Sequence, residues 1–263
     1  MNKIGVIAGS GLHEISGLEF VEKIVVSSKY GVPSESYSHF RYKRTDVYFL
    51  RRHGVKHQLP PHMINYCANI DGFRQLGVGS IVSVSAVGAI NRLLCPGDIA
   101  VTANAIDFTY NRGSTYFNGP EVFHIDMTDP FCPMLRESVL TAAEKAGVKV
   151  NDGGVYICVN GPRFETAAEI TAYGRLGADF VGMTLFPECV LARELGICYA
   201  NIGVITNYAA GISAQKLTSD EVVDIMIGSA ECVKSIIHKF LDSRLIRECS
   251  CRESLKGSKI SNE

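Results

Sequence analysis

The stretch that decides the fold is SIVSV, at residues 80–84, a run that is apolar at nearly every position. The stretch IGVI at residues 202–205 has the same character. A strand with one face in water alternates apolar and polar residues, so near-continuous apolar runs predict strands that are covered on both faces. Comparable runs predict strands at residues 3–8, 47–51, 80–84, 98–106, 154–159, 179–183 and 199–206.

Helical segments are predicted between these strands. Residues 134–147 carry apolar side chains at helical spacing and end at Gly147, a residue that suits a helix C-terminus. The clearest helix start is the pattern from Thr218 to Glu221, in which each side chain can cap the backbone N–H of the other. From this start one apolar face continues to Phe240, which predicts a long amphipathic helix.

The order of these elements predicts a single α/β domain, residues 1–246, with a mixed, largely parallel central sheet flanked by helices. Residues 247–263 form a polar C-terminal tail, which we interpret as a frayed and inert surface segment. Cys249 and Cys251 leave a redox pair open as the other interpretation of this tail. In sheets of this class ligands bind beyond the carboxyl ends of the strands, so we expect the site there.

Composition narrows the class of ligand. Lys plus Arg total 26 and Asp plus Glu total 27, so no overall positive field exists to hold nucleic acid or an acidic membrane surface. No apolar stretch is long enough for a membrane span, and no signal peptide is visible. The nine cysteines stand mostly singly in apolar stretches, which predicts reduced thiols and a cytoplasmic location. An anionic ligand would therefore need a locally built positive site.

Two clusters of anion-binding residue types follow predicted strands. The turn Gly9-Ser10-Gly11 lets backbone amides approach an anion, although glycines also serve ordinary tight turns. Arg52 and His53 offer a planar donor fork and an imidazole at the end of the next strand. The same segment could be a solvated basic turn.

A metal site is a further interpretation of that basic segment, because His53, His57 and His62 lie within ten residues. Zinc ligands usually share a helix or include Cys or Asp, whereas this segment is broken by Gly54 and by Pro60-Pro61. We therefore expect no metal.

Four later strand ends add groups suited to a nucleoside. Residues 83–88 are small, leave room for a sugar and a base, and offer the Ser85 hydroxyl. The other three ends follow the strands predicted at 154–159, 179–183 and 199–206. They supply an aromatic face, a carboxylate, a soft apolar floor, a hydroxyl and a carboxamide: Phe164, Glu165, Met183, Thr184 and Asn207. One such group could arise by chance, but this many at strand ends predict one binding site.

With these motifs in place, the sequence resembles the trimeric purine nucleoside phosphorylases and methylthioadenosine phosphorylases. The resemblance covers residues 3–240 and rests on a combination of motifs: Gly9-Ser10-Gly11-Leu12, Arg52-His53-Gly54 with His57, Asn65-Tyr66, Pro96-Gly97-Asp98, Asp129-Pro130-Phe131-Cys132-Pro133, Gly161-Pro162-Arg163-Phe164, Met183-Thr184 and Pro187-Glu188. The resemblance implies an α/β nucleoside phosphorylase fold, phosphate as a co-substrate, no metal or organic cofactor, and a homotrimer or dimer of trimers.

Carried over position by position, the resemblance implies a role for each candidate residue. Phosphate is assigned to Ser10, Arg52, His53, Ser85 and Thr184, and the nucleoside to Ala86, Val87, Gly88, Phe164, Glu165, Met183, Asn207, Ser219 and Val223. Asn207, Arg52 and His53 are expected to act directly in catalysis, and His124 to reach the site of a neighbouring subunit.

One departure from the methylthioadenosine branch decides the expected base. That branch carries Asp-x-Asp after the last strand, whereas this chain has Asn207-Tyr208-Ala209. Glu165 follows Phe164, as in the 6-oxopurine enzymes, where the carboxylate accepts the base N1–H. A neutral Asn207 can donate to N7 or O6, and a buried mismatch there costs about 1–3 kcal/mol. We therefore predict a 6-oxopurine nucleoside phosphorylase acting on inosine, guanosine or 5′-methylthioinosine.

Four other functions stay open from the sequence. A 5′-methylthioadenosine phosphorylase fits the closeness to that branch, and Ser219 with Val223 would accept either a 5′-hydroxyl or a methylthio group. A hydrolytic nucleosidase would not need the anion cluster. A metal-dependent hydrolase would use the three histidines, and a nucleotide-binding module would rest on Gly9-Ser10-Gly11 without the rest of its fingerprint.

Overall fold

The computed structural model describes residues 2–9, 17–214, 216–243 and 248–260. In this part of the chain eleven strands form one mixed sheet. The strands are β1 (Asn2–Ala8), β2 (Glu19–Ile24), β3 (Tyr37–Tyr42), β4 (Thr45–Arg51), β5 (Ser80–Ala89), β6 (Ile99–Val101), β7 (Asn104–Phe108), β8 (Asn151–Asp152), β9 (Val155–Val159), β10 (Phe180–Gly182) and β11 (Cys198–Tyr208). The predicted α/β class with a mixed, largely parallel sheet is confirmed.

Strand β5 is the centre of the sheet. Its first half pairs in parallel with β1, its whole length pairs in parallel with β11, and its last residues pair antiparallel with β10. The path β2-β3-β4-β1-β5-β10-β9-β7 is joined on the other side of β5 by β11, which carries β6 and then β8. A strand with partners on both sides and along its length holds the residues at its carboxyl end in a defined place.

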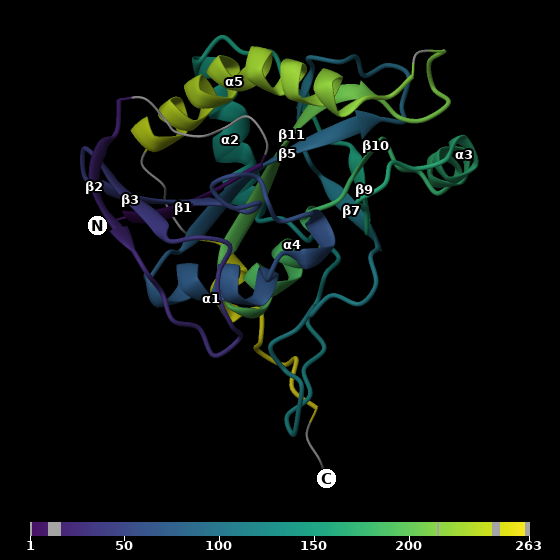
Figure 1. Cartoon of the computed structure of the whole chain (residues 1–263). Helices are drawn as coiled ribbons and strands as arrows, with labels where there is room; N and C mark the ends of the chain where they lie inside the picture. The colour runs from purple at the N-terminus through teal and green to yellow at the C-terminus, as the bar shows by residue number, and fades with distance from the viewer. Residues whose placement is uncertain (1, 10–16, 215, 244–247, 261–263) are drawn as a thin grey trace.

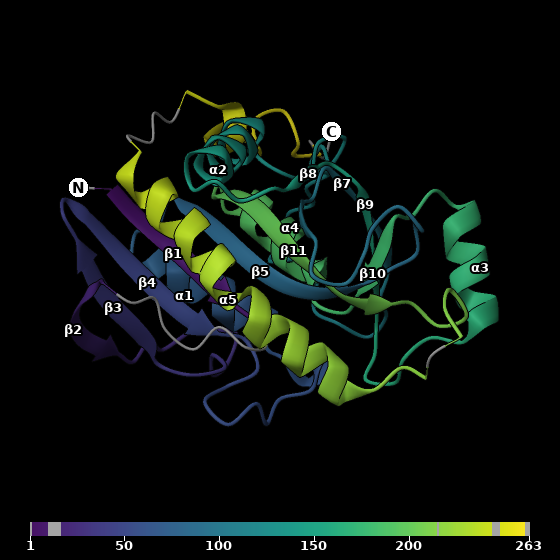
Figure 2. The ribbon, with the colours of Figure 1, turned by 90° about the horizontal axis from the view of Figure 1, so that it is seen from above.

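Helices cover both faces of this sheet (Figures 1 and 2). Helices α2 (Pro133–Lys145) and α5 (Ser219–Asp242) pack together on one face, and α1 (Tyr66–Gln75) and α4 (Leu185–Glu194) pack together on the other. Helix α3 (Ala167–Arg175) lies at the far end, beyond β9 and β10. Two short 3₁₀ helices span Pro61–Met63 and Ser250–Glu253. No helix in the described ranges is both long and apolar enough to cross a membrane.

The two-sided covering explains the apolar run that begins β5. Ile81 and Val82 are both fully buried, yet they belong to different core clusters because successive side chains of a strand point to opposite faces. Val82 packs with residues of α2 and α5, and Ile81 packs with residues of α1 and α4. Burying a side chain of this size contributes about 1.5–3 kcal/mol on either face.

The strands predicted from the sequence differ from the structure in three places. The single strand predicted at residues 98–106 is wrong: β6 pairs with β11 and β8, whereas β7 pairs with β9, so the chain changes partners between them. The β2–β3 hairpin was not predicted, because β2 is an exposed edge strand in which polar and apolar residues mix. Strand β5 also continues to Ala89, beyond the end predicted at residue 84.

The C-terminal segment is not frayed over its described residues. Cys251 is only 3 % exposed, and the backbone N–H of Ile260 donates to the carbonyl oxygen of Val122 at 3.0 Å. The N–H of His124 likewise donates to the carbonyl of Ser258 at 2.9 Å. Composition suggested a detached segment, but one buried cysteine and these backbone hydrogen bonds hold it against the domain.

Candidate active site

A cavity of about 360 Å³ lies where the carboxyl ends of β4, β5, β10 and β11 meet the turn after β1, with the first turn of α5 on one side. Its volume lies within the range of about 300–1,000 Å³ that is common for small-molecule sites. The predicted site residues that line it are Arg52, His53, Ser85, Ala86, Val87, Gly88, Phe164, Glu165, Met183, Thr184, Asn207, Ser219 and Val223. Ser10 lies outside the described residues, and His124 is absent from the described lining of its own chain's cavity.

Arg52 forms the floor of one half of the cavity. Its side chain is 1 % exposed, and its Nε and Nη2 donate to the two carboxylate oxygens of Glu188 at 2.7 and 3.1 Å. Nη1 donates to the carbonyl oxygen of Val84 at 2.6 Å. These bonds use only part of the guanidinium's donors, so the remaining N–H groups on Nη1 and Nη2 can serve an anion in the cavity. Glu188 thus fixes the orientation of a buried cation.

The turn after β1 approaches this guanidinium closely. A Cβ on Gly9 would lie 3.1 Å from Arg52 Nη1 and 2.9 Å from the carbonyl oxygen of Val84. The first contact is tight and the second is closer than real Cβ atoms come, so the backbone reaches this position only with glycine.

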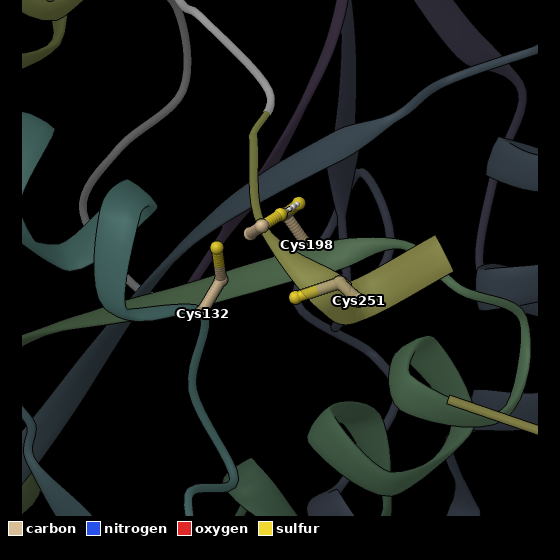
Figure 3. A group of neighbouring side chains, drawn as sticks. Cys132, Cys198 and Cys251 are labelled. Carbon is tan, nitrogen blue, oxygen red and sulfur yellow. Dashed lines mark hydrogen bonds between the residues drawn. The ribbon is translucent and has the colours of Figure 1, made fainter. Parts of the chain in front are cut away.

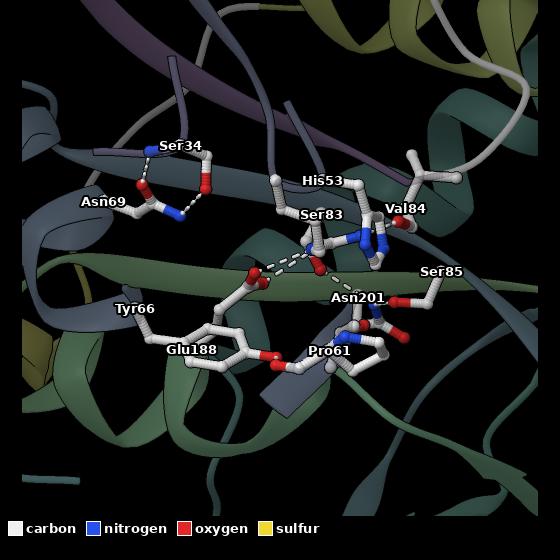
Figure 4. A network of polar contacts seen from close by, with 12 residues as sticks. Ser34, His53, Pro61, Tyr66, Asn69, Ser83, Val84, Ser85, Glu188 and Asn201 are labelled. Atoms are coloured by element: carbon white, nitrogen blue, oxygen red, sulfur yellow. Dashed lines mark hydrogen bonds and ion pairs between the residues drawn. The ribbon is translucent and has the colours of Figure 1, made fainter. Parts of the chain in front are cut away.

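A buried polar network extends from Glu188 beneath the cavity (Figure 4). The Tyr199 hydroxyl lies 2.8 Å from Glu188 Oε2 and 2.7 Å from Ser83 Oγ. The Asn201 Nδ2 donates to Ser83 Oγ at 2.7 Å and to Ser85 Oγ at 2.9 Å. Because the Ser85 oxygen accepts from Asn201, its own proton is available to a ligand in the cavity. The network therefore orients Ser85 as a donor.

His53 follows Arg52 in the chain and lines the same half of the cavity. Its Nδ1 lies 2.8 Å from the carbonyl oxygen of Leu59, and since a carbonyl can only accept, Nδ1 carries the proton. Burial, the charge of Arg52 and the neighbouring His57 lower the pKa of His53 to about 4. At neutral pH Nε2 is therefore an acceptor, suited to a protonated phosphate oxygen, and a bound anion would favour the charged ring.

Thr184 stands at the N-cap of α4 and is 6 % exposed. Its side chain makes no capping hydrogen bond, so its hydroxyl is not used by the helix. Phe186 has non-helical dihedral angles (φ −98°, ψ 134°), so the regular turns of α4 begin only after it, and Thr184 offers its own hydroxyl rather than a helix N-terminus. With Arg52, His53 and Ser85, Thr184 makes one half of the cavity a site for an oxyanion.

Glu165 faces the other half of the cavity. Its Oε1 is buried and has no hydrogen-bond partner among the described residues, and burial raises the pKa of this carboxyl. The nearby Arg163 does not neutralise it, because Arg163 pairs with both oxygens of Glu169 at 2.8 and 2.7 Å. A buried acceptor without a donor costs about 1–3 kcal/mol, which a ligand N–H at this oxygen would recover.

Asn207 closes the same half at the end of β11 and is 5 % exposed. The Thr206 hydroxyl donates to its Oδ1 at 2.8 Å, and its Nδ2 donates to the Tyr208 carbonyl at 2.9 Å. One Nδ2–H is left over, and Nδ2 packs so closely on Gly88 that a Cβ there would lie 2.9 Å away. Asn207 is thus held as a donor.

Apolar side chains complete the cavity. Phe164 is 37 % exposed and Val223, on the first turn of α5, is 44 % exposed. Met183 packs against Gly161, where an added Cβ would lie 2.5 Å from its sulfur. An exposed aromatic face, a soft thioether and a branched side chain around polar groups suit a flat heterocycle joined to a sugar.

The three histidines of the metal interpretation do not converge. His53 and His57 stack on each other, with ring centroids 4.3 Å apart, and His62 lies exposed in the 3₁₀ helix Pro61–Met63. Within the described ranges, the groups with metal-ligand spacing do not include these residues.

The comparisons with known proteins decide the family. The model of the phosphorylase superfamily matches residues 3–242. The chain belongs to the phosphorylase superfamily. Within it, the chain is 44 % identical to a probable S-methyl-5′-thioinosine phosphorylase of Thermodesulfovibrio yellowstonii, over 97 % of each chain.

Two further similarities span nearly the whole length of the proteins compared. The chain is 42 % identical to the 6-oxopurine nucleoside phosphorylase of Pyrococcus furiosus, over 98 % of this chain and 99 % of the relative. Among solved structures of the superfamily, a methylthioadenosine phosphorylase from an antarctic soil metagenomic library superimposes with a TM-score of 0.90 at 31 % identity, covering 99 % of this chain and 93 % of that one. The resemblance to purine nucleoside and methylthioadenosine phosphorylases is confirmed.

The sequence did not identify the residues that hold the phosphorylase site in place. Glu188, Tyr199 and Asn201 are each buried beneath the cavity, and none was selected for a role. Their signal was a polar residue inside an otherwise apolar element, such as Asn201 in the run 198–206. Arg112 was also not selected from the sequence. Its guanidinium donates to the carbonyl oxygens of Met183 and Phe186 at 2.9 and 2.6 Å, and so it stabilises the kinked start of α4 and the residues just before it.

Proposed function

We propose that the protein cleaves 6-oxopurine nucleosides, namely inosine, guanosine or 5′-methylthioinosine, with inorganic phosphate. The products are the free base and ribose 1-phosphate or its methylthio form. The observation that carries the choice of base is the carboxylate of Glu165, which lines the cavity and whose buried Oε1 has no hydrogen-bond partner among the described residues. A 6-oxopurine offers a donor at N1, whereas a 6-aminopurine offers an acceptor there and would leave a carboxylate without a partner.

Phosphate is the co-substrate in this proposal, and no metal or organic cofactor takes part in the bond cleavage. Arg52, Ser85 and Thr184 would donate to phosphate oxygens, with Ser10 on the turn after β1. The His53 Nε2 would accept from a protonated phosphate oxygen. Rupture of the N9–C1′ bond leaves positive charge on the sugar, which the adjacent phosphate stabilises before its oxygen bonds to C1′.

The departing purine takes up the electron pair of the N9–C1′ bond. The remaining Asn207 Nδ2–H would donate to N7 or O6, where negative charge grows during the reaction. This hydrogen bond strengthens towards the transition state, so it lowers the barrier rather than merely tightening binding. Glu165 would orient the base through N1–H, and the exposed face of Phe164 would pack against the ring.

A 5′-methylthioadenosine phosphorylase is the alternative, and one observation favours it. Burial raises the pKa of Glu165, so a protonated carboxyl that donates to adenine N1 is less costly here than in water. At the 5′ end, Ser219 and Val223 suit a hydroxyl and a methylthio group respectively.

The test is a panel of inosine, guanosine, adenosine, methylthioadenosine and methylthioinosine, each with and without phosphate. We expect base release only with phosphate, and a sugar 1-phosphate as the second product. Each 6-oxopurine should be cleaved at least about tenfold faster, in kcat/KM, than its 6-amino counterpart, a difference of about 1.4 kcal/mol. Equal release without phosphate would favour hydrolysis, and equal kcat/KM for methylthioadenosine and methylthioinosine would favour the alternative.

The assembly and the location of the protein also remain predictions. His124 is exposed and lies beside the C-terminal segment, a position from which it can meet a second chain. We infer a homotrimer or a dimer of trimers, which light scattering would check, and a cytoplasmic location, which fractionation would check. A fully active monomer would exclude a shared site.

A further inference from the structure

Four cysteines converge on the side of the molecule where the C-terminal segment packs. The sulfur atoms of Cys132, Cys198, Cys249 and Cys251 all lie within 4.8 Å of one another. Three of these residues are 2–3 % exposed and Cys249 is half-buried. Figure 3 shows Cys132, Cys198 and Cys251 directed toward one another from separate segments of the chain. None of the four lines the active-site cavity.

The four residues are brought together by tertiary structure alone. Cys132 is the N-cap of α2, and Cys198 is the first residue of β11. Cys249 and Cys251 flank the start of the 3₁₀ helix Ser250–Glu253. Only Cys249 and Cys251 are close in sequence, so the cluster cannot be predicted from a compact metal-binding motif.

We propose that these four thiolates bind one structural Zn²⁺ ion. In a tetrahedral site with Zn–S bonds of about 2.3 Å, the sulfur atoms lie about 3.8 Å from one another. The observed cluster brackets that spacing, with 3.3 Å between the sulfurs of Cys198 and Cys249 and 4.8 Å as the upper bound. Each sulfur lies near all three others, as a single central ion requires, whereas disulfides would need the sulfurs to separate into bonded pairs.

Positive charge is also placed at this cluster. The Arg193 Nη1 lies 3.9 Å from Cys251 Sγ, and the buried Arg193 Nε has no hydrogen-bond partner among the described residues. In addition, the N-terminal end of the 13-residue helix α2 begins directly after Cys132. Four neutral thiols would not need a guanidinium and a helix N-terminus, but four thiolates around a divalent ion carry net negative charge that both would offset.

The ion would be structural rather than catalytic. Four protein ligands fill a tetrahedral zinc site and leave no position for water. By joining the C-terminal segment to the start of β11 and to α2, the ion would fix residues 248–260, which in turn hold Val122 and His124 by backbone hydrogen bonds. This proposal departs from the expectation of a metal-free chain and is independent of the base that the enzyme cleaves.

Metal content provides the first test. The full chain should be purified without chelator and without a metal-affinity tag. Inductively coupled plasma mass spectrometry should then find about one zinc ion per chain. A mercurial reagent that blocks thiols should release this zinc to a colorimetric indicator. The protein refolded with Co²⁺ should show thiolate-to-cobalt charge-transfer absorption and the visible bands of a tetrahedral site.

The double variant Cys249→Ser with Cys251→Ser should lose the zinc and melt at a lower temperature. Cys232→Ser is the matched control, because Cys232 is exposed on α5 and outside the group, and it should keep both zinc and melting temperature. Zinc that stays in the double variant would overturn the proposal. So would a metal-free wild type whose intact mass is lower than that of the reduced chain by two or four hydrogens, since this shows disulfides.

If the double variant does not fold, the cobalt spectrum of the wild-type chain decides. Absorption without a thiolate charge-transfer band would place any bound metal elsewhere and would overturn the proposal. The band itself would support it.

Discussion

The two halves of the active-site cavity are built in opposite ways. On the phosphate side, Arg52 and Glu188 are at most 1 % exposed and satisfy each other, and Tyr199, Ser83 and Asn201 continue the hydrogen bonds. On the base side, Glu165 Oε1 is buried without a partner in the described structure, and Phe164 is 37 % exposed. The donors of the phosphate side are held in place by hydrogen bonds within the protein before the ligand arrives, whereas the base side contains a buried acceptor whose hydrogen bond the ligand would supply.

This difference separates reactivity from specificity. A prearranged network holds oxyanion donors in place and needs little reorganisation during the reaction. Unsatisfied groups discriminate instead, because a ligand that lacks the matching donor leaves them buried and unpaired. Changes on the phosphate side should therefore lower the free energy of unfolding and the kcat/KM for every substrate. Changes on the base side should alter the ratio of kcat/KM between substrates.

The largest expected effect comes from removing the partner of Arg52. Glu188→Ala leaves a buried, unpaired guanidinium and should lower the free energy of unfolding by about 3–5 kcal/mol. The matched control is Asp152→Ala, which breaks the exposed ion pair with Arg136 and should cost less than about 1 kcal/mol. Urea unfolding of both variants measures the contrast. Equal losses would mean that the buried pair is no more critical than a surface one.

The second effect is a pH dependence that originates on the phosphate side. The pKa of His53 is lowered to about 4 in the folded chain, mainly by burial, against an ordinary value of 6.5. Because the unfolded chain takes up this proton first, the stabilisation is complete above pH 6.5 and is lost as the pH falls toward 4. The full loss is on the order of 3 kcal/mol.

Urea unfolding between pH 7.5 and pH 4 would measure this loss, with and without phosphate. A bound anion favours the charged ring, so phosphate should reduce the fall in stability. The control is His53→Gln, which has no titrating group and should show a smaller pH dependence. An unchanged pH dependence in that variant would assign the loss to other groups.

On the base side, Glu165→Ala should act on substrates unequally. It removes the acceptor for N1–H, so the transition state of a 6-oxopurine nucleoside should lose about 1–3 kcal/mol of stabilisation, which lowers kcat/KM by roughly 5- to 160-fold. The 6-amino counterpart should lose much less, and the KM for phosphate should not change. Stability should be maintained, since the variant removes a buried oxygen that has no partner in the described structure. A parallel loss for both substrates would contradict the assigned contact.

The smallest expected change is Asn207→Asp. It replaces a donor with an acceptor and should shift the ratio of kcat/KM toward the 6-aminopurine by about tenfold, or about 1.4 kcal/mol. Adding Ala209→Asp would blur this test, because Ala209 is 2 % exposed and packs in a core cluster rather than in the cavity lining. Steady-state kinetics with inosine and adenosine would measure the ratio, and an unchanged ratio would remove Asn207 from base selection.

Much of the site could be predicted from the sequence because the ends of the strands have a recognisable residue pattern. Arg52, Ser85, Thr184 and Asn207 each belong to a polar or small-residue segment at the carboxyl end of an apolar run. Parallel strands bring such ends to one edge of a sheet, so local pattern predicted a non-local cluster. The long helix α5 was predicted for the same kind of reason, from its cap and its apolar face.

Tertiary structure decided what lies beneath that edge and at the C-terminus. The pairing of Arg52 with Glu188 spans 136 residues, and the pairing of Asn201 with Ser85 spans 116. The four-cysteine cluster unites α2, β11 and the C-terminal segment. Hydrophobic periodicity reports which face of an element is buried, but it does not report which distant element covers that face. The sequence by itself therefore determined the fold class and most of the cavity lining, whereas only the folded chain decided the partners of its buried charges and thiols.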